Sequence, residues 1–271
     1  MWGQIAKSTL CKIVGISRNL LYYEYKQEAK DIKIKDKIEK VLADNKYYGS
    51  VRIALELKLN KKRIKRVMKK YGILTYKQKK KPFKKEDMNK PDTQIPNMIK
   101  NICPLAPNVI WSSDFTYIPY GNGFIYLSTV LDIYTREVVG VNISKYHNAE
   151  LVTKALIDAL TKENAPMYLH SDQGSEYTSL QYINLVKQAG IIFSNSKKSS
   201  PWENGYQESF YSHFKEELGD TNRFKTVEEL IEAVYQQIYY YNNNRIHTAL
   251  KMKPAEFKKA YLSNNLMRQV V

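Results

Sequence analysis

Residues 108–120, "NVIWSSDFTYIPY", begin the part of the chain that decides its fold. β-Branched and aromatic residues alternate there with polar ones, which is typical of a β-strand. A "GNG" turn at 121–123 leads into the strongly apolar "FIYLSTVLDIYT", and "REVVGVNIS" follows at 136–144. Three strands joined by such short turns predict an antiparallel meander.

Helix and strand patterns alternate after the meander. Apolar residues recur at helical spacing in 148–162, in 178–190, from about Glu203 to Glu217, and in 226–242. Two short apolar runs between these helices, "PMYLHSD" and "IIFSNS", predict buried strands. The order βββ-α-β-α-β-α indicates an α/β fold, in which a mixed sheet carries helices on its faces.

A smaller helical region precedes the sheet. Short helices are predicted at 31–43, after Ser50, which can cap the second helix, and at 61–72, where Asn60 is the expected N-cap. The last of them, "KKRIKRVMKKYG", is heavily basic, and two short helices with a tight break resemble a helix-turn-helix motif. The alternative is a small helical bundle whose lysines are solvated. We expect the basic helix to contact DNA through Arg63, Lys65 and Arg66.

Composition divides the chain into four segments. Residues 1–76 form the helical region, 77–104 a basic linker, 105–262 the core with its C-terminal helices, and 263–271 a tail. The linker combines runs of lysine with three prolines and few large apolar residues, a composition typical of an extended connection.

The net charge indicates the kind of partner. The 271 residues carry a formal charge of +16, with a sequence pI of about 9.5. Such a charge predicts attraction to a polyanion through phosphate contacts and counterion release, although an anionic membrane surface is the other partner that it allows. No run approaches the roughly 18 apolar residues of a membrane span, so we expect no membrane partner. Two distant cysteines, Cys11 and Cys103, fit a reducing cytoplasm.

Three acidic residues fall where a sheet of this order would bring them together. Asp114 interrupts the first strand, where aspartate is disfavoured. Asp172 ends the strand "MYLHSD", at the edge where open sheets carry their ligands. Glu208 lies on the helix after the last strand, with Asn204 and Lys215 on the same helical face. Because the first and fourth strands are commonly neighbours in such a sheet, we expect one cluster of three carboxylates.

A cluster of this kind predicts a metal site. Mutual repulsion would raise the carboxyl pKa values unless a cation neutralised it. Mg²⁺, or Mn²⁺ in its place, accepts carboxylate oxygens and keeps positions open for phosphate and water. Two such ions about 4 Å apart activate the attacking oxygen and stabilise the leaving one in a displacement at phosphorus. The spacing of the acids is a weak signal alone, but each lies on the element that this chemistry requires.

Taken in order, the motifs resemble a known family. "WSSDFTYI", "LDIYTREVVG", "LHSDQGSEY" and "ESFYSHFKEE" are similar to the catalytic core of the Asp-Asp-Glu transposases of bacterial insertion sequences, specifically the second-frame protein of the IS-three group. "YNNNRIHTALKMKPAEF" is similar to their closing motif. "YYGSVRIALEL" with "NKKRIKRVMKKYGI" resembles the helix-turn-helix segment that precedes the core. The resemblance covers nearly the whole chain.

The resemblance implies a ribonuclease-H-like core, similar to that of retroviral integrases, with Asp114, Asp172 and Glu208 as the metal-binding catalytic triad. The implied activity is cleavage at the ends of the element to free a 3′-hydroxyl, which then attacks a phosphodiester of target DNA. It also implies a homo-oligomer that handles two element ends, a first-frame partner protein, and a place in the bacterial cytoplasm at the nucleoid. One departure is Glu203, where members usually carry Asp.

Four further residues are candidates for DNA contacts. Lys215 lies two turns after Glu208 and would point toward DNA, although it could equally be a surface lysine. Asn204 could hold Glu208 or the substrate strand. Arg245 and His247 lie in the closing motif, where phosphate contact and local structural pairing are equal alternatives.

Two other functions are compatible with parts of the pattern. A truncated transposase could bind DNA as a catalytically silent regulator, but all three carboxylates are intact. A simple ribonuclease-H-like nuclease would cut without joining, but the basic N-terminal region and the closing motif argue against it.

Overall fold

The computed structural model describes residues 7–17, 19, 27–76, 95–196 and 204–269. The chain divides into two compact units, Met1–Thr75 and Tyr76–Val271. Within the described ranges, no helix has the length and apolar character needed to cross a membrane.

The first unit is helical, as predicted. Its described helices are α1 (Lys7–Val14), α3 (Gln27–Asp44), α4 (Ser50–Glu56) and α5 (Lys61–Lys70). Gly15, which follows α1, has a φ of 68°, a conformation that glycine adopts readily and that suits the end of a helix.

Helices α4 and α5 form the predicted pair. The side chain of Asn60 accepts a hydrogen bond from the N–H of Lys62 at 2.8 Å, which confirms the N-cap of α5. The N-cap of α4 is Gly49 and not Ser50, because Gly49 is the last extended residue and Ser50 already lies in the helix. The apolar stripes of α3, α4 and α5 make the core of this unit, which includes Ile34, Ile38, Ile53, Ile64 and Val67.

A buried carboxylate ties α3 to α5. Asp31 is fully buried and accepts hydrogen bonds from both terminal nitrogens of Arg66, at 2.5 and 2.7 Å. These hydrogen bonds are the main reason why the pKa of Asp31 is lowered to about 2. Glu28 binds Lys70 at 2.5 Å and the hydroxyl of Tyr71 at 2.8 Å. Ionic contacts therefore supplement the apolar core between these two helices.

The second unit is built on a five-stranded mixed sheet of order β3-β2-β1-β4-β5. Strands β1 (Ile110–Tyr120), β2 (Gly123–Asp132) and β3 (Val138–Ser144) pair antiparallel, which confirms the predicted meander. Strand β4 (Tyr168–Ser171) pairs parallel with β1, and β5 (Ile192–Asn195) pairs parallel with β4. The first and fourth strands are thus neighbours, as expected.

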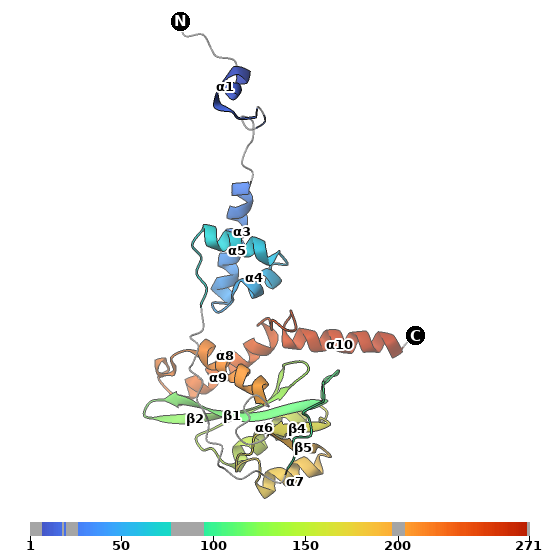
Figure 1. Cartoon of the computed structure of the whole chain (residues 1–271). Coiled ribbons are helices and arrows are strands. Elements are labelled where there is room, and N and C mark those ends of the chain that lie inside the picture. Colours follow the sequence, from blue (N-terminus) through green and yellow to red (C-terminus); the bar gives the residue numbers. More distant parts are fainter. Residues whose placement is uncertain (1–6, 18, 20–26, 77–94, 197–203, 270–271) are drawn as a thin grey trace. The chain divides into compact units, whose positions relative to one another are not determined.

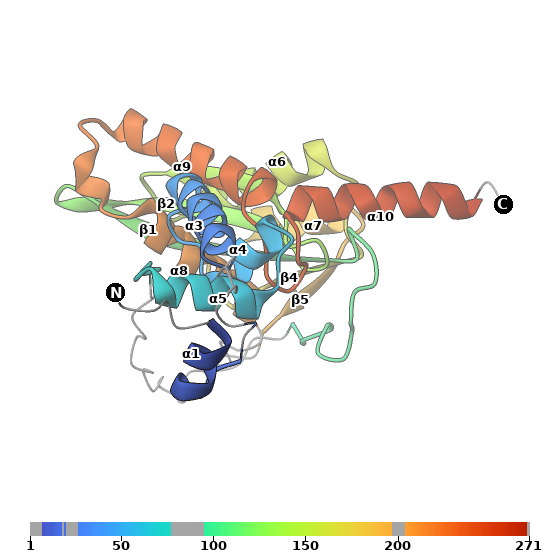
Figure 2. The same cartoon turned by 90° about the horizontal axis from the view of Figure 1, so that it is seen from above.

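Helices cover both faces of the sheet (Figure 1, Figure 2). On one face, α6 (Ala149–Lys162) and α7 (Leu180–Gln188) pack around a buried cluster that includes Trp111. On the other, α8 (Gly205–Leu218) and α9 (Val227–Asn243) pack around a second cluster. The predicted order of strands and helices is therefore confirmed.

The ends of this unit differ from the predicted segments. Helix α10 (Pro254–Gln269) continues past Ser263, where a tail was expected, and a short 3₁₀ helix, η2 (Thr221–Arg223), follows α8. Lys258 on α10 binds Glu163 and, at 3.1 Å, Glu137, so the start of this helix is attached to the core. Residues 77–94 of the predicted linker lie outside the described residues.

The last residues of the predicted linker are in contact with the sheet. The N–H of Met98 donates a hydrogen bond to Oγ of Ser194 on β5 at 2.9 Å. The N–H of Asn195 donates to the carbonyl of Pro96 at 3.4 Å. The core therefore begins earlier in the chain than residue 105.

The close packing of α6 on β3 gives a test of the fold. A Cβ added at Gly140 would lie 2.3 Å from the carbonyl oxygen of Ala155 and 2.6 Å from Cβ of Ala159. Helix backbone cannot yield cheaply, so we expect Gly140→Ala to lower the free energy of unfolding by about 1–3 kcal/mol. Urea denaturation would measure it. Gly123→Ala is the control, since its Cβ meets nothing within 4 Å; equal stability of the two variants would contradict the packing.

Candidate active site

Asp114 lies within β1, just beyond the segment that pairs with β4. That parallel pairing runs from Ile110 to Ser112, whereas the antiparallel pairing with β2 continues and sets Asp114 opposite Thr129. Its Oδ1 accepts a hydrogen bond from the N–H of Phe115 at 2.8 Å. The carboxylate is therefore oriented by its own strand, at the point where the neighbouring strand ends.

The register of β1 and β4 brings Asp172 to the same place. Ile110 pairs with Tyr168, an offset of 58 residues (168 − 110), and Asp172 follows Asp114 by the same offset (172 − 114). Asp172 comes directly after the last residue of β4. Its Oδ1 accepts a hydrogen bond from the N–H of Gly174 at 3.0 Å, within the turn that leads away from the sheet. The two aspartates thus lie side by side at one edge of adjacent parallel strands.

Helix α8 carries Glu208 to these aspartates, and two neighbouring side chains fix the helix on the sheet. Nε2 of Gln207, which is fully buried, donates to the carbonyl of Ser112 at 2.6 Å and to that of Thr129 at 3.2 Å. The hydroxyl of Tyr211 donates to the carbonyl of Asp114 at 2.6 Å. Neither residue was predicted to belong to the site. A glutamine within the apolar stripe of this helix was the available signal.

The pKa of Asp114 reports how the three carboxylates interact. Burial is the largest cause that raises it to about 8 from its ordinary value of 3.8, followed by the charge of Asp172 and then that of Glu208. The pKa of Asp172 is also raised, mainly by burial and further by Glu176. The charges of Asp172 and Glu208, which are distant in sequence, therefore both act on Asp114.

Glu176 is a fourth carboxylate near the site, which the sequence analysis did not single out. It raises the pKa of Asp172, and its Oε1 lies 3.2 Å from Nδ1 of His147. The turn after β4 brings both carboxylates close to Gly174: a Cβ added there would lie 3.1 Å from Oδ1 of Asp172 and 3.0 Å from Oε2 of Glu176. The spacing Asp-Gln-Gly-Ser-Glu was the signal that could have found it.

The donor set can be compared with the needs of a metal ion. Carboxylate oxygens are the ligands that Mg²⁺ and Mn²⁺ prefer, and a cation would relieve the repulsion that Asp114 experiences. As the side chains stand, no three His, Cys, Asp or Glu of the described chain lie close enough together to hold an ion. Glu208 is exposed on α8, and its charge acts on Asp114. The residues therefore fit a hard divalent cation in chemistry, once their side chains rotate.

Two further predicted residues, Lys215 on α8 and Asn204 at its N-cap, contact β1. Nζ of Lys215 lies over the ring of Tyr117, 4.3 Å from its centroid, and its charge lowers the pKa of Asp114. Asn204 is buried, and its Oδ1 accepts a hydrogen bond from Oγ of Ser112 at 2.6 Å. Asn204 therefore connects the start of α8 to β1.

The predicted DNA contacts of α5 differ in their surroundings. Lys65 is exposed and Arg63 is half-buried, whereas Arg66 is bound to the buried Asp31. This ion pair gives Arg66 a structural role in the helical unit. The DNA contacts of all three stay predictions.

The closing-motif residues are paired within the core. Arg245 is 2% exposed, and its Nε lies 2.7 Å from Oε1 of Glu217, so local structural pairing is the alternative observed for this residue. His247 is half-buried, and its backbone N–H donates to the carbonyl of Met252 at 2.9 Å. Glu203, the departure from the family pattern, lies outside the described residues.

The raised pKa of Asp114 predicts a pH-dependent cost to stability. Because the folded state holds this proton more tightly than the unfolded state, wild-type stability should fall as pH rises from about 4 to about 8. Asp114→Asn keeps an oxygen to accept from Phe115 but removes the charge. In EDTA at pH 8, we expect this variant to be more stable than wild type by about 1–3 kcal/mol.

Urea denaturation at pH 5 and pH 8 would measure the difference. Glu228→Gln, an exposed carboxylate on α9, is the control and should show little change. A difference between Asp114→Asn and wild type that did not grow with pH would show that the Asp114 charge is not repelled in the folded state.

Known proteins match most of this chain. Two family models, both described as integrase core domain, match residues 104–201 and 189–254. A transposase for insertion sequence element IS904 from Lactococcus lactis is 34% identical over 247 residues, which are 86% of this chain and 96% of the relative. A putative transposase, InsK, for insertion sequence element IS150 from Escherichia coli is 31% identical over 263 residues, 92% of each chain.

A solved structure has the same fold. In the cryo-EM structure of the simian T-cell lymphotropic virus intasome in complex with PP2A regulatory subunit B56 gamma, one chain aligns with a TM-score of 0.50 and 16% identity, over 82% of this chain and 74% of that one. This likeness bears on the fold and agrees with the ribonuclease-H-like α/β architecture. The near full-length transposase relatives and the integrase core models show that the chain belongs to the Asp-Asp-Glu transposases of bacterial insertion sequences, a class of polynucleotidyl transferases.

Proposed function

We propose that this transposase cleaves the 3′ ends of its insertion sequence and transfers them to target DNA, with Asp114, Asp172 and Glu208 as the metal-binding carboxylates. The observation that carries the proposal is the parallel register of β1 and β4, which sets Asp114 beside Asp172, with α8 and its Glu208 held against β1 by Gln207 and Tyr211. The raised pKa of Asp114, to which the charges of both other carboxylates contribute, supports it. Two divalent cations, Mg²⁺ or Mn²⁺, would supply activation of the attacking oxygen and stabilisation of the leaving oxygen when bound.

The structure orients the three carboxylate side chains to different extents. Asp114 is fixed by strand pairing and by its hydrogen bond from Phe115, and Asp172 by the N–H of Gly174. Glu208 is exposed on α8. We infer that the aspartates form the preformed part of the site and that Glu208 completes it when metal and DNA bind.

Lys215 would contact the DNA that enters this site. Its charge acts on Asp114 from the same helix that carries Glu208, and Tyr117 beneath it is exposed. A cation next to a carboxylate cluster suits a phosphate that approaches between them. The ring of Tyr117 offers a surface on which a base could stack.

We also infer assembly beyond one chain. Two element ends must be cut and joined together, so the active form is expected to be a homo-oligomer, and a first-frame protein is expected to assist in recognising the ends. The formal charge of +16 supports binding of both the element ends and target DNA.

Removal of any one carboxylate tests the catalytic assignment. We expect Asp114→Ala, Asp172→Ala and Glu208→Gln each to reduce 3′ cleavage and strand transfer at least about a hundredfold, because each removes a ligand or a charge that positions metal. A strand-transfer assay with labelled element ends and Mg²⁺ or Mn²⁺ would measure this. DNA affinity, measured by gel shift, should be nearly unchanged.

Glu216→Gln is the matched control, since Glu216 is an acid on the same helix and lies two turns beyond Glu208. Wild-type strand transfer by any one carboxylate variant would refute the triad. Absence of joining by the wild-type protein, even with the first-frame protein supplied, would favour a DNA-binding regulator, and cut products without joined ones would favour a simple nuclease.

The basic helix α5 gives a separate prediction about DNA affinity. We expect Arg63→Gln and Lys65→Gln each to weaken DNA binding and to reduce the slope of log affinity against log salt by about one. Arg66→Gln should instead lower the melting temperature of the helical unit, because the buried Asp31 loses its partner. Salt titration by fluorescence anisotropy, with thermal melting in parallel, separates the two effects. Unchanged salt slopes would place the DNA surface elsewhere.

A further inference from the structure

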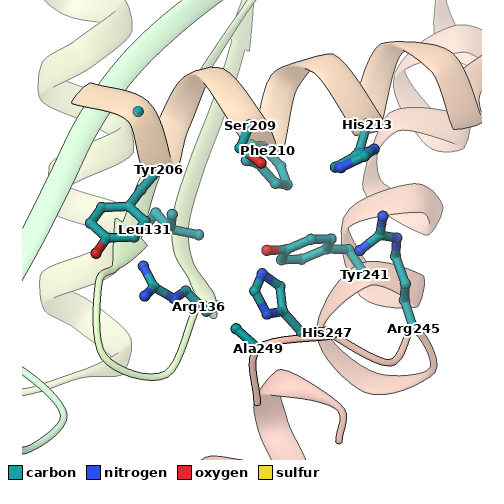
Figure 3. Close-up of a pocket in the computed structure, with 11 residues that line it drawn as sticks. Leu131, Arg136, Tyr206, Ser209, Phe210, His213, Tyr241, Arg245, His247 and Ala249 are labelled. Carbon is teal, nitrogen blue, oxygen red and sulfur yellow. The ribbon is translucent and has the colours of Figure 1, made fainter. Parts of the chain in front are cut away.

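A cavity of about 450 Å³ lies beside α8, lined also by the end of β2, the β2–β3 turn, α9 and the segment after α9. This volume falls within the range of small-molecule sites. Figure 3 shows Tyr206 and His213 on α8 above the cavity, with Arg136 and His247 below. Tyr241 and Arg245 approach from the side of α9 (Figure 3).

The cavity lies on a different side of α8 from the proposed catalytic carboxylate. Ser209 and His213, four residues apart, both line it and share one helical face. Glu208 and Lys215, nearly two turns apart, share another face. The buried residues Gln207 and Tyr211, which bind the sheet, belong to neither pair. The two sites therefore share a helix but not a surface.

Two guanidinium groups line the cavity with unsatisfied donors. Nε and Nη1 of Arg136, and Nη2 of Arg245, are buried and have no hydrogen-bond partner among the described residues. Arg245 is fixed behind by Glu217, and the guanidinium of Arg136 lies over the ring of Tyr206, 3.8 Å from its centroid. Buried donors of this kind are normally satisfied, and both arginines line this one cavity, so an acceptor bound there would supply a partner that the described residues do not.

The other residues that line the cavity indicate which chemical class of ligand it could bind. Among the described residues no carboxylate lines the cavity, whereas His213 and His247 add two imidazoles to the two arginines. Leu131, Phe210 and Tyr241 provide an apolar and aromatic wall. Two guanidinium groups suit the oxygens of a phosphate, and an aromatic wall suits a base.

We propose that this cavity binds a nucleoside phosphate, with the phosphate on Arg136 and the base against the aromatic wall. The same chemistry is offered by a free nucleotide and by one nucleotide of a DNA strand. The site requires neither metal nor the three carboxylates, so it stands independently of the catalytic assignment.

Binding to the full chain in EDTA tests the proposal. The probes are inorganic phosphate, dAMP and a short single-stranded oligodeoxynucleotide, measured by isothermal titration calorimetry. We expect Arg136→Gln to weaken the binding of dAMP about tenfold, because it removes a charge-assisted contact. Ala249→Phe, which fills the cavity from an exposed position without changing charge, should have a similar effect.

The matched control is Arg223→Gln, since Arg223 also lies over an aromatic ring, that of Phe224, but outside the cavity. It should bind dAMP as wild type does. Tighter binding of the oligonucleotide with the same dependence on Arg136 identifies a DNA strand as the ligand, and equal affinities identify a free nucleotide. The proposal is overturned if no probe binds saturably, or if both cavity variants bind as tightly as wild type.

Discussion

The site depends on how α8 is docked on the sheet. Gln207 is fully buried and places its amide on carbonyls of two different strands, β1 and β2, while Tyr211 binds the carbonyl of Asp114 itself. A buried glutamine without these acceptors would be costly, so the helix is stable in this position and rotation. Because Glu208 directly follows Gln207, the same hydrogen bonds determine how close that carboxylate comes to Asp114. Packing alone, through Phe210 and Phe214, would tolerate more variation.

The carboxylates illustrate why a functional site opposes stability. Asp114 lies on a strand that a helix covers on one face and that β2 holds in register. Its pKa is raised because burial and the acidic neighbours both disfavour the charged form. The rest of the unit offsets this cost: two apolar clusters pack on opposite faces of the sheet. The helical unit shows the opposite arrangement, since Asp31 is buried with Arg66 and its pKa is lowered. Burial of an acid thus has opposite consequences depending on whether a cation accompanies it.

Much of the fold could be predicted because its signals are local. Alternation in 108–144 predicted the meander, and the caps Asn60 and Thr226 define the starts of two helices. Predictions were wrong or incomplete where a long-range contact decides the outcome. Lys258 attaches the start of α10 to Glu137 and Glu163, which are distant in sequence. The contact of Met98 with Ser194 also joins residues that are far apart along the chain. That β1 and β4 are neighbours could be predicted from the order of elements. The residue-by-residue register, which brings Asp114 beside Asp172, could not.

In the candidate site, too, local signals could be predicted from the sequence and long-range contacts could not. Acids in unusual places, such as Asp114 within a strand, are visible in the sequence because the residue type conflicts with its local environment. Gln207, Tyr211 and Arg136 conflict with nothing locally; their importance comes from which carbonyls, rings or cavity lie opposite them in the folded chain. Arg245 shows how a motif position can be interpreted in two ways, since one side of its guanidinium binds Glu217 and the other lines a cavity. A conflict between residue type and local structure can therefore locate the chemistry of a site, whereas the residues that hold that chemistry in place are found only once the tertiary contacts are known.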